Sequence, residues 1–393
     1  MNRGAWNRLK SPSLRPLDVY VNVNVIGKGI VARRVRPNTK DHRMNPLESQ
    51  LDYPFGDTIP VPGTVTQVAP GLYWLRMPLP FALDHVNLWL LEDEVDGRRG
   101  WSLIDCGAGT DATRAAWEQL FTGAMGSLPL LRVFATHCHP DHVGLSGWLC
   151  ERHGAPFWTS AAEFGFARMM AAALPGVDGP SAIPHFQRHG LVAETMLEQM
   201  RTRKNYYPSL VPSVPPAYVR LQDGQQVRIG GAMWRVITGF GHSPEHVSLY
   251  SEERNVLVSG DMVLPRISTN VSVFAVEPEG NPLQSYLDSL EKFAGLPGDV
   301  LVLPSHGKPF RGLHTRIGQL RDHHAARLDE VRAVCVTPQS AVDIVPIMFR
   351  RKLDAHQLSF AVGEALAHLH YLLYFGNLQR VTGEDGILRF KLV

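Results

Sequence analysis

Short apolar runs separated by Gly, Pro and Asp begin near residue 62 and continue to about residue 310. Runs of this length with turn residues between them are typical of β-strands. They lie at 72–75, 86–91, 101–104, 132–135, 234–237, 247–250, 256–259 and 300–303. Helical segments are predicted between them, at 112–120, 145–153, 161–173 and 282–294. Strands and helices mixed on this scale predict an α/β architecture in which helices cover sheets.

The rest of the chain follows a different pattern. Segment 151–230 is expected to be helical and then irregular, because "TRKNYYPSLVPSVPPAY" is too rich in proline for a regular element, and this insertion could form a lid. After residue 310, apolar residues at helical spacing predict one long helix, then helices near 340–351 and 355–375. A β-hairpin is expected around the turn at 383–386. These elements predict a small separate C-terminal domain over residues 311–393.

The first 43 residues carry ten Lys or Arg and two Asp, whereas the rest of the chain carries 29 basic and 35 acidic residues. They show no clear helical period, so we predict an N-terminal extension over 1–61 that is flexible to about residue 43. The stretch "GKGIVA" at 27–32 is not followed by a plausible helix and is therefore not interpreted as a dinucleotide-binding motif.

The composition, with 44% apolar and 19% charged residues, is that of an ordinary globular protein. No run approaches the roughly 18 to 20 apolar residues of a membrane-spanning helix, and the N-terminus lacks the pattern of a signal peptide. The four cysteines form no CxxC pair, so reduced thiols are expected. We therefore predict a cytoplasmic protein with no membrane partner.

The segment "ATHCHPDHVG" places His137, His139, Asp141 and His142 within six positions, directly after a predicted strand. This density indicates a metal site, because imidazole nitrogens and carboxylate oxygens are ligands that zinc favours. Further candidates follow other apolar runs: Asp105 in "LIDCG", His242 in "GHSPEH", Asp261 in "SGD" and His306 in "PSHG". Each lies just past the C-terminal end of a predicted strand, where loops gather side chains at one edge of a sheet.

Taken in order, these five segments resemble the metallo-β-lactamase superfamily, and more narrowly its glyoxalase II-like hydrolases. The resemblance covers about residues 62–310 and implies a four-layer αββα sandwich with a two-metal site at its edge. It assigns the first metal to His137, His139 and His242, the second to Asp141, His142 and His306, and a bridging position to Asp261. It also implies that Asp105 orients the ligand loop by hydrogen bonding.

Two cations about 3.5 to 4 Å apart can supply hydroxide at neutral pH from a shared water and polarise a scissile carbonyl or phosphoryl oxygen. The implied reaction is therefore hydrolysis by a metal-bridged hydroxide, with zinc as the expected metal and manganese or iron as alternatives. Asp141, a ligand with a spare oxygen, is the catalytic candidate that would orient the nucleophile or pass on its proton.

The expected substrate is a small molecule, a thioester or ester of an acylated carrier. Glyoxalase II-like sequences often have "GHTPGH" where this chain has "GHSPEH", so Glu245 replaces a glycine, and no glutathione-binding residues are placed. Arg266, five residues beyond Asp261, is a weaker candidate that could bind a substrate carboxylate or phosphate. A surface ion pair explains Arg266 equally well. His185, His189, His246 and His314 are interpreted as structural, and Cys138 as a packing residue.

The C-terminal segment resembles the winged-helix-like appendage of the β-lactamase-like protein 2 group, which includes RNA-cleaving and thioester-cleaving enzymes. An endoribonuclease acting on single-stranded RNA is therefore an alternative, in which Tyr206 and Tyr207 stack on bases. Residues 354–377 contain no Lys or Arg, so duplex DNA is not an expected partner. The leucine-rich face there is expected to pack on the main domain or on another copy in a homo-oligomer. A non-catalytic metal-binding scaffold is a second alternative, which the complete ligand set disfavours.

Overall fold

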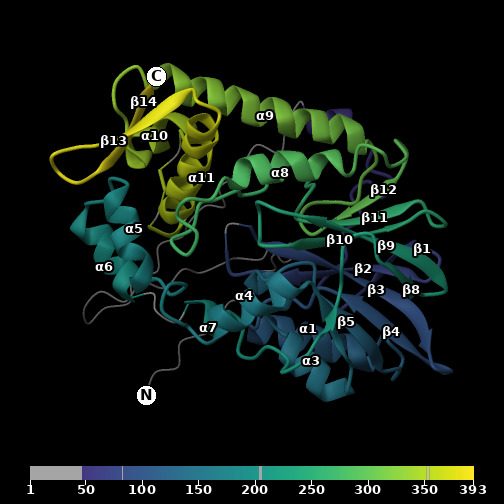
Figure 1. Ribbon diagram of the computed structural model, residues 1–393. Coiled ribbons are helices and arrows are strands. Elements are labelled where there is room, and N and C mark those ends of the chain that lie inside the picture. The colour runs from purple at the N-terminus through teal and green to yellow at the C-terminus, as the bar shows by residue number, and fades with distance from the viewer. Residues whose placement is uncertain (1–46, 82, 203–205, 351, 354) are drawn as a thin grey trace, which may run out of the picture. The chain divides into compact units, whose positions relative to one another are not determined.

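The computed structural model describes residues 47–81, 83–202, 206–350, 352–353 and 355–393 (Figure 1). The predicted flexible region up to residue 43, with its "GKGIVA" stretch, lies outside these residues. The described residues form one compact unit. Among the described residues, no helix combines the length and the apolar character needed to cross a membrane.

A seven-stranded sheet forms the first half of a sandwich, in the order β1-β2-β3-β4-β5-β6-β7. Its strands are β1 (Thr66–Ala69), β2 (Leu72–Pro78), β3 (His85–Val95), β4 (Arg98–Ile104), β5 (Leu130–Phe134), β6 (Phe157–Thr159) and β7 (Val219–Arg220). Strands β1 to β4 pair antiparallel, and β4 to β7 pair parallel. The sequence pattern predicted β2 to β5 but missed β1, β6 and β7, because strands of two to four residues are too short to show a period.

The second sheet has five strands in the order β12-β11-β10-β9-β8. They are β8 (Gln226–Ile229), β9 (Ala232–Gly239), β10 (His246–Ser251), β11 (Val256–Gly260) and β12 (Leu301–Pro304). Strands β11 and β12 are parallel, and the other pairs are antiparallel. Only β8 was not predicted from the sequence.

The two sheets pack face to face through one apolar core. Trp74 and Trp89 from the first sheet are fully buried in it, as are Trp234 and Val258 from the second. The rings of Trp74 and Trp89 stack with their centroids 6.3 Å apart. Large aromatic side chains contribute much of the buried area that holds such layers together.

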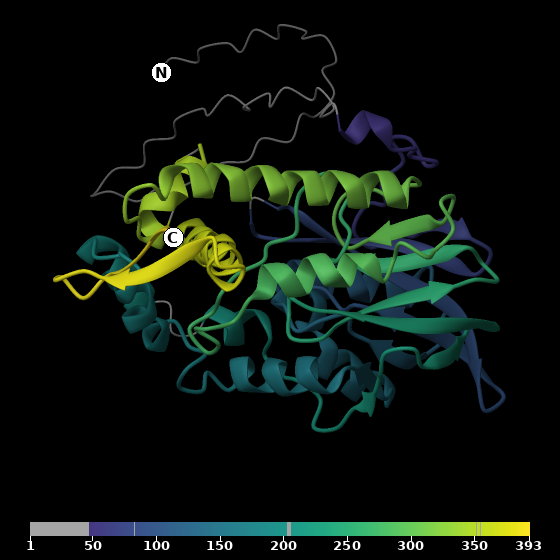
Figure 2. The ribbon, with the colours of Figure 1, turned by 45° about the horizontal axis from the view of Figure 1, so that its top comes forward.

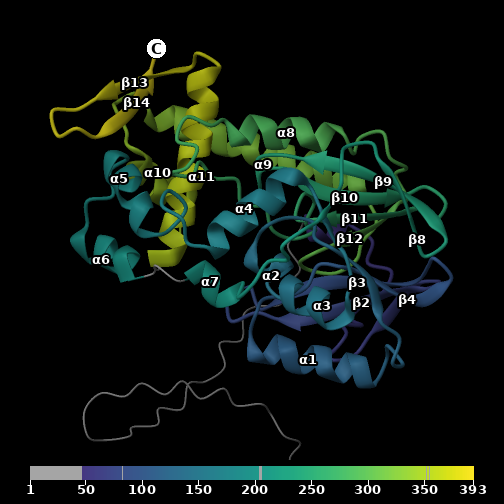
Figure 3. The same ribbon diagram turned by 60° about the horizontal axis from the view of Figure 1, so that its bottom comes forward.

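Helices cover both outer faces of the sandwich (Figures 1 and 3). The first sheet carries α1 (Asp111–Thr122), α3 (Ser146–His153) and α4 (Ala161–Ala171), while the short α2 (Pro140–Val143) lies in the loop after β5. The second sheet carries α8 (Pro282–Glu291) and α9 (Leu313–Val334). Trp117 of α1 and Tyr286 of α8 are among the side chains that fill the two outer cores. This confirms the predicted αββα sandwich.

An insertion after α4 consists of the short helices η2 (Pro180–Ala182), α5 (Ile183–Arg188), α6 (Glu194–Thr202) and α7 (Tyr206–Leu210). The expectation that residues 202–218 contain no regular element was wrong at α7. Pro208 is the third residue of that helix, where its missing N–H costs no helical hydrogen bond. The buried Tyr207 packs this turn onto the core of the first sheet.

The C-terminal segment has the predicted helices and hairpin: α10 (Ala341–Met348), α11 (Ala355–Tyr374), β13 (Leu378–Thr382) and β14 (Leu388–Leu392). Figure 2 shows the hairpin beside α11, with α9 running over α8. The apolar residues of α11, such as Val362 and Leu366, share one core with α8, α9 and the second sheet. The leucine-rich face thus packs on the main domain. The domain boundaries and the winged-helix comparison stay predictions. Near the start of the described chain, η1 (Glu48–Gln50) leads into Leu51, which packs in the same core.

Candidate metal centre

The predicted ligands lie in loops that follow strands at one edge of the sandwich. In the first sheet, Asp105 follows β4 and the loop from His137 follows β5. Because β4 and β5 are parallel, their C-terminal ends lie at the same edge. In the second sheet, β9, β11 and β12 lead into His242, Asp261 and His306. The folding of both sheets therefore brings residues far apart in the chain to one place.

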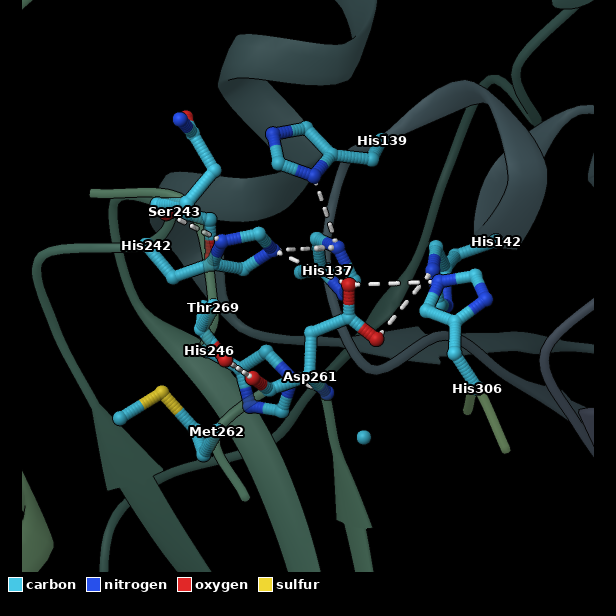
Figure 4. Close-up of polar contacts among 12 residues, drawn as sticks. His137, His139, His142, His242, Ser243, His246, Asp261, Met262, Thr269 and His306 are labelled. Atoms are coloured by element: carbon cyan, nitrogen blue, oxygen red, sulfur yellow. Dashed lines mark hydrogen bonds and ion pairs between the residues drawn. The ribbon is translucent and has the colours of Figure 1, made fainter. Parts of the chain in front are cut away.

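Potential ligand side chains form three overlapping groups of three residues. Within each group, the ligand atoms lie within 4.8 Å of one another. The groups are His137, His139 and His242; His137, His142 and Asp261; and Asp141, His142 and His306. Together they contain all seven residues that were predicted to bind metal. Figure 4 shows the carboxylate of Asp261 between the rings of His242 and His142.

The first group is a cluster of three imidazole rings with converging nitrogens. Nε2 of His137 lies 2.9 Å from Nδ1 of His139 and 3.1 Å from Nε2 of His242. The Nδ1 atom of His242 donates to the carbonyl oxygen of Asn270 at 2.8 Å, which leaves a lone pair on its Nε2. One shared proton cannot satisfy all three converging nitrogens, whereas a divalent cation accepts a lone pair from each. The donor set therefore fits a metal ion.

Two carboxylates extend the site beside this cluster. Oδ2 of Asp141 lies 3.4 Å from Nε2 of His142 and 3.4 Å from Nε2 of His306. Oδ2 of Asp261 lies 3.4 Å from Nε2 of His242 and 3.5 Å from Nε2 of His306. Within the described part of the chain, Nε2 of His142 and Oδ1 of Asp261 are buried without a hydrogen-bond partner. Buried polar atoms are rarely left unsatisfied, and a bound cation would satisfy both.

The outward-facing nitrogens of two further rings are held by acceptors. Nδ1 of His142 donates to Oδ2 of Asp105 at 2.8 Å, and Nδ1 of His306 donates to the carbonyl oxygen of His85 at 2.8 Å. In the neutral rings these contacts place the proton on Nδ1, so that Nε2 carries a lone pair and faces the cluster. The rings are therefore oriented as metal ligands before any ion binds.

Asp105 adopts a left-handed backbone conformation with φ of 64°, which is uncommon for a residue other than glycine. Its buried carboxylate accepts hydrogen bonds from the backbone N–H of Thr136 at 2.8 Å and from the Thr136 hydroxyl, in addition to that from His142. One carboxylate therefore holds both the start of the ligand loop and one of its rings.

Burial and neighbouring charges set the protonation of the cluster. Burial and the neighbouring imidazoles hold the pKa of His137 well below its usual value, so this ring is a neutral ligand. Burial would raise the pKa of Asp261, but His306 and His142 outweigh it and hold that pKa well below the usual range. Burial lowers the pKa of His306, but the carboxylates of Asp261 and Asp141 raise it to about 10. The site thus concentrates negative charge that protons or metal cations compensate.

Other sequence candidates lie outside the three ligand groups. The side chain of Arg266 is 59% exposed, and its Nε atom lies 3.8 Å from Oε2 of Glu48. The structure therefore gives Arg266 the surface ion pair, and its role in substrate binding stays a prediction. His246 is buried, and its Nε2 accepts a hydrogen bond from the backbone N–H of Asp261 at 3.1 Å. Nε2 of His314 donates to the carbonyl oxygen of Leu296 at 2.9 Å.

Two residues that support the ligand loops were not predicted from the sequence. Asn270 accepts from His242 through its carbonyl oxygen, and its side-chain amide donates to Glu364 of α11 at 3.3 Å. Glu163 of α4 joins two ligand loops from a buried position. Neither residue belongs to a recognisable motif. The only signal was an acidic residue within a predicted helix segment that is otherwise largely apolar.

Comparison with known proteins adds the family. The model of the metallo-beta-lactamase superfamily matches residues 82–306, and that of the metallo-beta-lactamase-like C-terminal domain matches residues 328–393. The crystal structure of a beta-lactamase domain protein from Burkholderia ambifaria is 56% identical, covers 89% of this chain and 100% of that chain, and has a TM-score of 0.85.

Two curated relatives are more distant. The probable metallo-hydrolase YqjP of Bacillus subtilis is 24% identical over 312 residues, which are 76% of this chain and 91% of that protein. The atrochrysone carboxyl ACP thioesterase of Aspergillus fumigatus is 26% identical over 231 residues, which are 58% of this chain and 54% of that protein. The matched family model covers more than half of the chain and all the ligand loops, and the chain therefore belongs to the metallo-beta-lactamase superfamily of metallohydrolases.

Proposed function

We propose that this chain hydrolyses a thioester or ester of a small acylated carrier with the help of two divalent metal ions. His137, His139 and His242 would hold the first ion, Asp141, His142 and His306 the second, and Asp261 would contact both. The observation that carries the proposal is the set of converging lone pairs and unpartnered buried atoms at one sheet edge. Zinc is the expected metal, because the ligands are imidazole nitrogens and carboxylate oxygens. Manganese and iron are alternatives.

Bound metal ions would supply activated water and polarise the scissile carbonyl. The side chains of the chain itself supply orientation and proton transfer. Asp141 presents its Oδ2 atom to His142 and His306, which leaves Oδ1 to accept a proton from the nucleophile. The side chain of Asp141 is 17% exposed, more than its neighbours His142 and His306, so it is better placed than they are to meet a substrate.

Support for an acylated carrier comes from the fungal relative named as an acyl-carrier-protein thioesterase. The metal site alone suits carbonyl and phosphoryl substrates equally. One contact weakens the RNA alternative. Tyr207 is buried, and its hydroxyl donates to the carbonyl oxygen of Cys138, so its ring is not available to stack on a base.

Two arginines of the C-terminal hairpin are also engaged. Arg380 binds the carboxylate of Glu279 at 2.9 and 3.0 Å, and Arg389 binds Asp385 at 2.6 and 2.8 Å. Phosphate contacts by these arginines would have to compete with the acids. This arrangement favours a small-molecule substrate over RNA and over duplex DNA.

The test is a substrate panel with metal-loaded protein: acyl-CoA, acyl-glutathione, acyl carrier protein thioesters, a lactone and single-stranded RNA. We expect turnover of at least one thioester or ester, lost on chelation and restored by zinc. Efficient cleavage of RNA without thioester or ester turnover would contradict the proposed substrate class. Metal binding without turnover of any member would favour the non-catalytic scaffold.

A further inference from the structure

Glu163 lies in the first turn of α4, where its side chain points away from solvent. The residue is 1% exposed. Ser160 caps the same turn by accepting the backbone N–H of Glu163. A carboxylate so deeply buried is rare unless it has specific partners. The proposed hydrolytic chemistry makes no use of Glu163, so its partners indicate another role.

Among the described residues, the hydrogen bonds that this carboxylate accepts all come from two ligand loops. Oε2 accepts the backbone N–H of Cys138 at 2.7 Å. Oε1 accepts the hydroxyl of Ser243 at 2.6 Å and the backbone N–H of Glu245 at 2.7 Å. Cys138 lies between His137 and His139 in the chain, and the other two donors follow His242. Glu163 therefore connects the two loops that carry the three converging imidazole rings.

The start of α4 makes two further contacts with the loop that follows His242. The hydroxyl of Ser160 donates to the carbonyl oxygen of Glu245 at 2.8 Å, and the backbone N–H of Ala162 lies 3.4 Å from Oε2 of Glu245. A carboxylate is favourable near a helix N-terminus because of the free N–H groups there. The glutamate that replaces the usual glycine at position 245 thus has a physical role in fastening α4 to the loop.

We propose that Glu163 is a positioning residue that sets the spacing of His137 and His139 relative to His242, and so the affinity of the first metal position. This inference rests on the proposed metal site. Hydrogen bonds to a charged acceptor are stronger than neutral ones, and only a carboxylate offers acceptors to both loops at once. The amide of a glutamine would turn an N–H₂ group toward one of the loops and leave donors facing donors.

A simple stabilising role for Glu163 is the competing explanation, and Asp93 provides the matched control. Asp93 is also buried in the first sheet, at 8% exposure, where it forms an ion pair with Arg132 and accepts hydrogen bonds from Ser102 at 2.5 Å and from the backbone N–H of Gly230 at 2.9 Å. It pairs with Gly100 near the start of β4, toward the opposite end of that strand from the ligand loops. Asp93→Asn should therefore cost stability without affecting metal binding.

The experiment compares the full-length wild type, Glu163→Gln and Asp93→Asn, each stripped of metal and titrated with Co²⁺ and Zn²⁺ in the presence of a competing chelator. We expect Glu163→Gln to weaken one of two binding steps by about 10- to 100-fold. Its Co²⁺ absorption should change, because the ligand geometry of the first position changes. Asp93→Asn should keep both affinities and the spectrum of the wild type, whatever its melting temperature.

Unchanged affinities and an unchanged spectrum in Glu163→Gln would overturn the inference, and so would an equal loss of affinity in Asp93→Asn. If Glu163→Gln does not fold, Ser243→Ala tests the inference in its place. This variant removes one hydrogen-bond donor to Glu163 and leaves the carboxylate in place. We expect a several-fold weakening of the same step, and an unchanged affinity would overturn the inference. A wild type that binds no metal would instead contradict the proposed function itself, so the two failures are distinguishable.

Discussion

Oδ2 of Asp105 lies 2.8 Å from Nδ1 of His142, and the same buried carboxylate accepts the backbone N–H of Thr136. Asp105 belongs to none of the three ligand groups. It nevertheless holds both Thr136, which directly precedes the ligand loop, and the ring of His142 within that loop. Its left-handed φ of 64° shows that the backbone bends to bring it there.

Asp105→Asn should weaken metal binding by about 10- to 100-fold, as loss of such supporting contacts usually does. Asparagine tolerates the left-handed conformation, so the substitution removes charge with little backbone strain. Competition with a chelator would measure the loss. Asp105→Ala adds the backbone strain and should also lower the melting temperature. Wild-type affinity in Asp105→Asn would show that the carboxylate does not orient His142.

Asp261→Ala should lower the metal content and reduce turnover by orders of magnitude without unfolding the sheets. Its carboxylate lies within 3.4 to 3.8 Å of the rings of His242, His306 and His142, so its removal takes away the group between the two proposed metal positions. Elemental analysis measures the metal content, and circular dichroism shows whether the sheets stay folded. Asp223→Ala, which breaks a surface pair with Lys292 at 3.1 Å, is the control that should keep both metals.

His246→Ala, by contrast, is unsuitable as a neutral control. The ring is fully buried, and its Nε2 accepts the backbone N–H of Asp261. A Cβ atom on Gly260 would come within 2.3 Å of that Nε2 atom, so the ring fills the space beside the backbone. Loss of this ring would disturb the neighbouring aspartate indirectly.

Metal-free protein should lose stability as the pH rises toward 10. The pKa of His306 is raised to about 10, mainly by Asp261 and Asp141 against the effect of burial. A histidine whose pKa is higher in the folded than in the unfolded state stabilises the folded protein. This contribution is fully present below the unfolded-state pKa of about 6.5, and it is lost as the pH rises through the folded-state pKa. Thermal melts of chelated protein from pH 6 to 10 would show the decline.

Metal-loaded protein should behave differently over the same range. Ligands bind in their deprotonated forms, so metal affinity rises with pH. A metal at 100 times its Kd stabilises the fold by about 2.7 kcal/mol. Loaded protein that declines in parallel with chelated protein would mean that His306 is not a ligand.

Gly363→Ala tests the contact between α11 and the loop after Asp261. A Cβ at Gly363 would lie 2.8 Å from Cβ of Ser272, so the loop that contains Asn270 must shift. We expect lower stability and weaker metal binding, measured by thermal melts and chelator competition. Gly318→Ala in α9 is the control, since a Cβ there meets no atom within 4 Å, and it should stabilise the protein by up to about 1 kcal/mol.

The residues that could be predicted from the sequence are those whose chemistry is local. Histidines after apolar runs indicated a metal site, and the structure brings all seven predicted ligands into three overlapping groups. Most strands also followed from apolar runs, because strands such as β5 and β11 are buried along their whole length and consist mainly of apolar residues, whereas the αββα layers followed from the family resemblance.

The supporting residues could not be predicted, because their roles depend on packing between distant elements. Glu163 and Ser243 are 80 positions apart in the chain, and Asn270 and Glu364 are 94 apart. No local pattern encodes such pairs. Helix α7 was missed for a related reason, since Tyr207 is held by the core of the first sheet and not by helix propensity.

The most direct test of the central claim is the metal content of the purified full-length protein after reconstitution with excess zinc and removal of free ions. Seven side chains in three overlapping groups are more ligands than one ion needs. Elemental analysis should therefore find close to two ions per chain, and about one or fewer in Asp261→Ala. A wild-type value below one ion per chain would contradict the account.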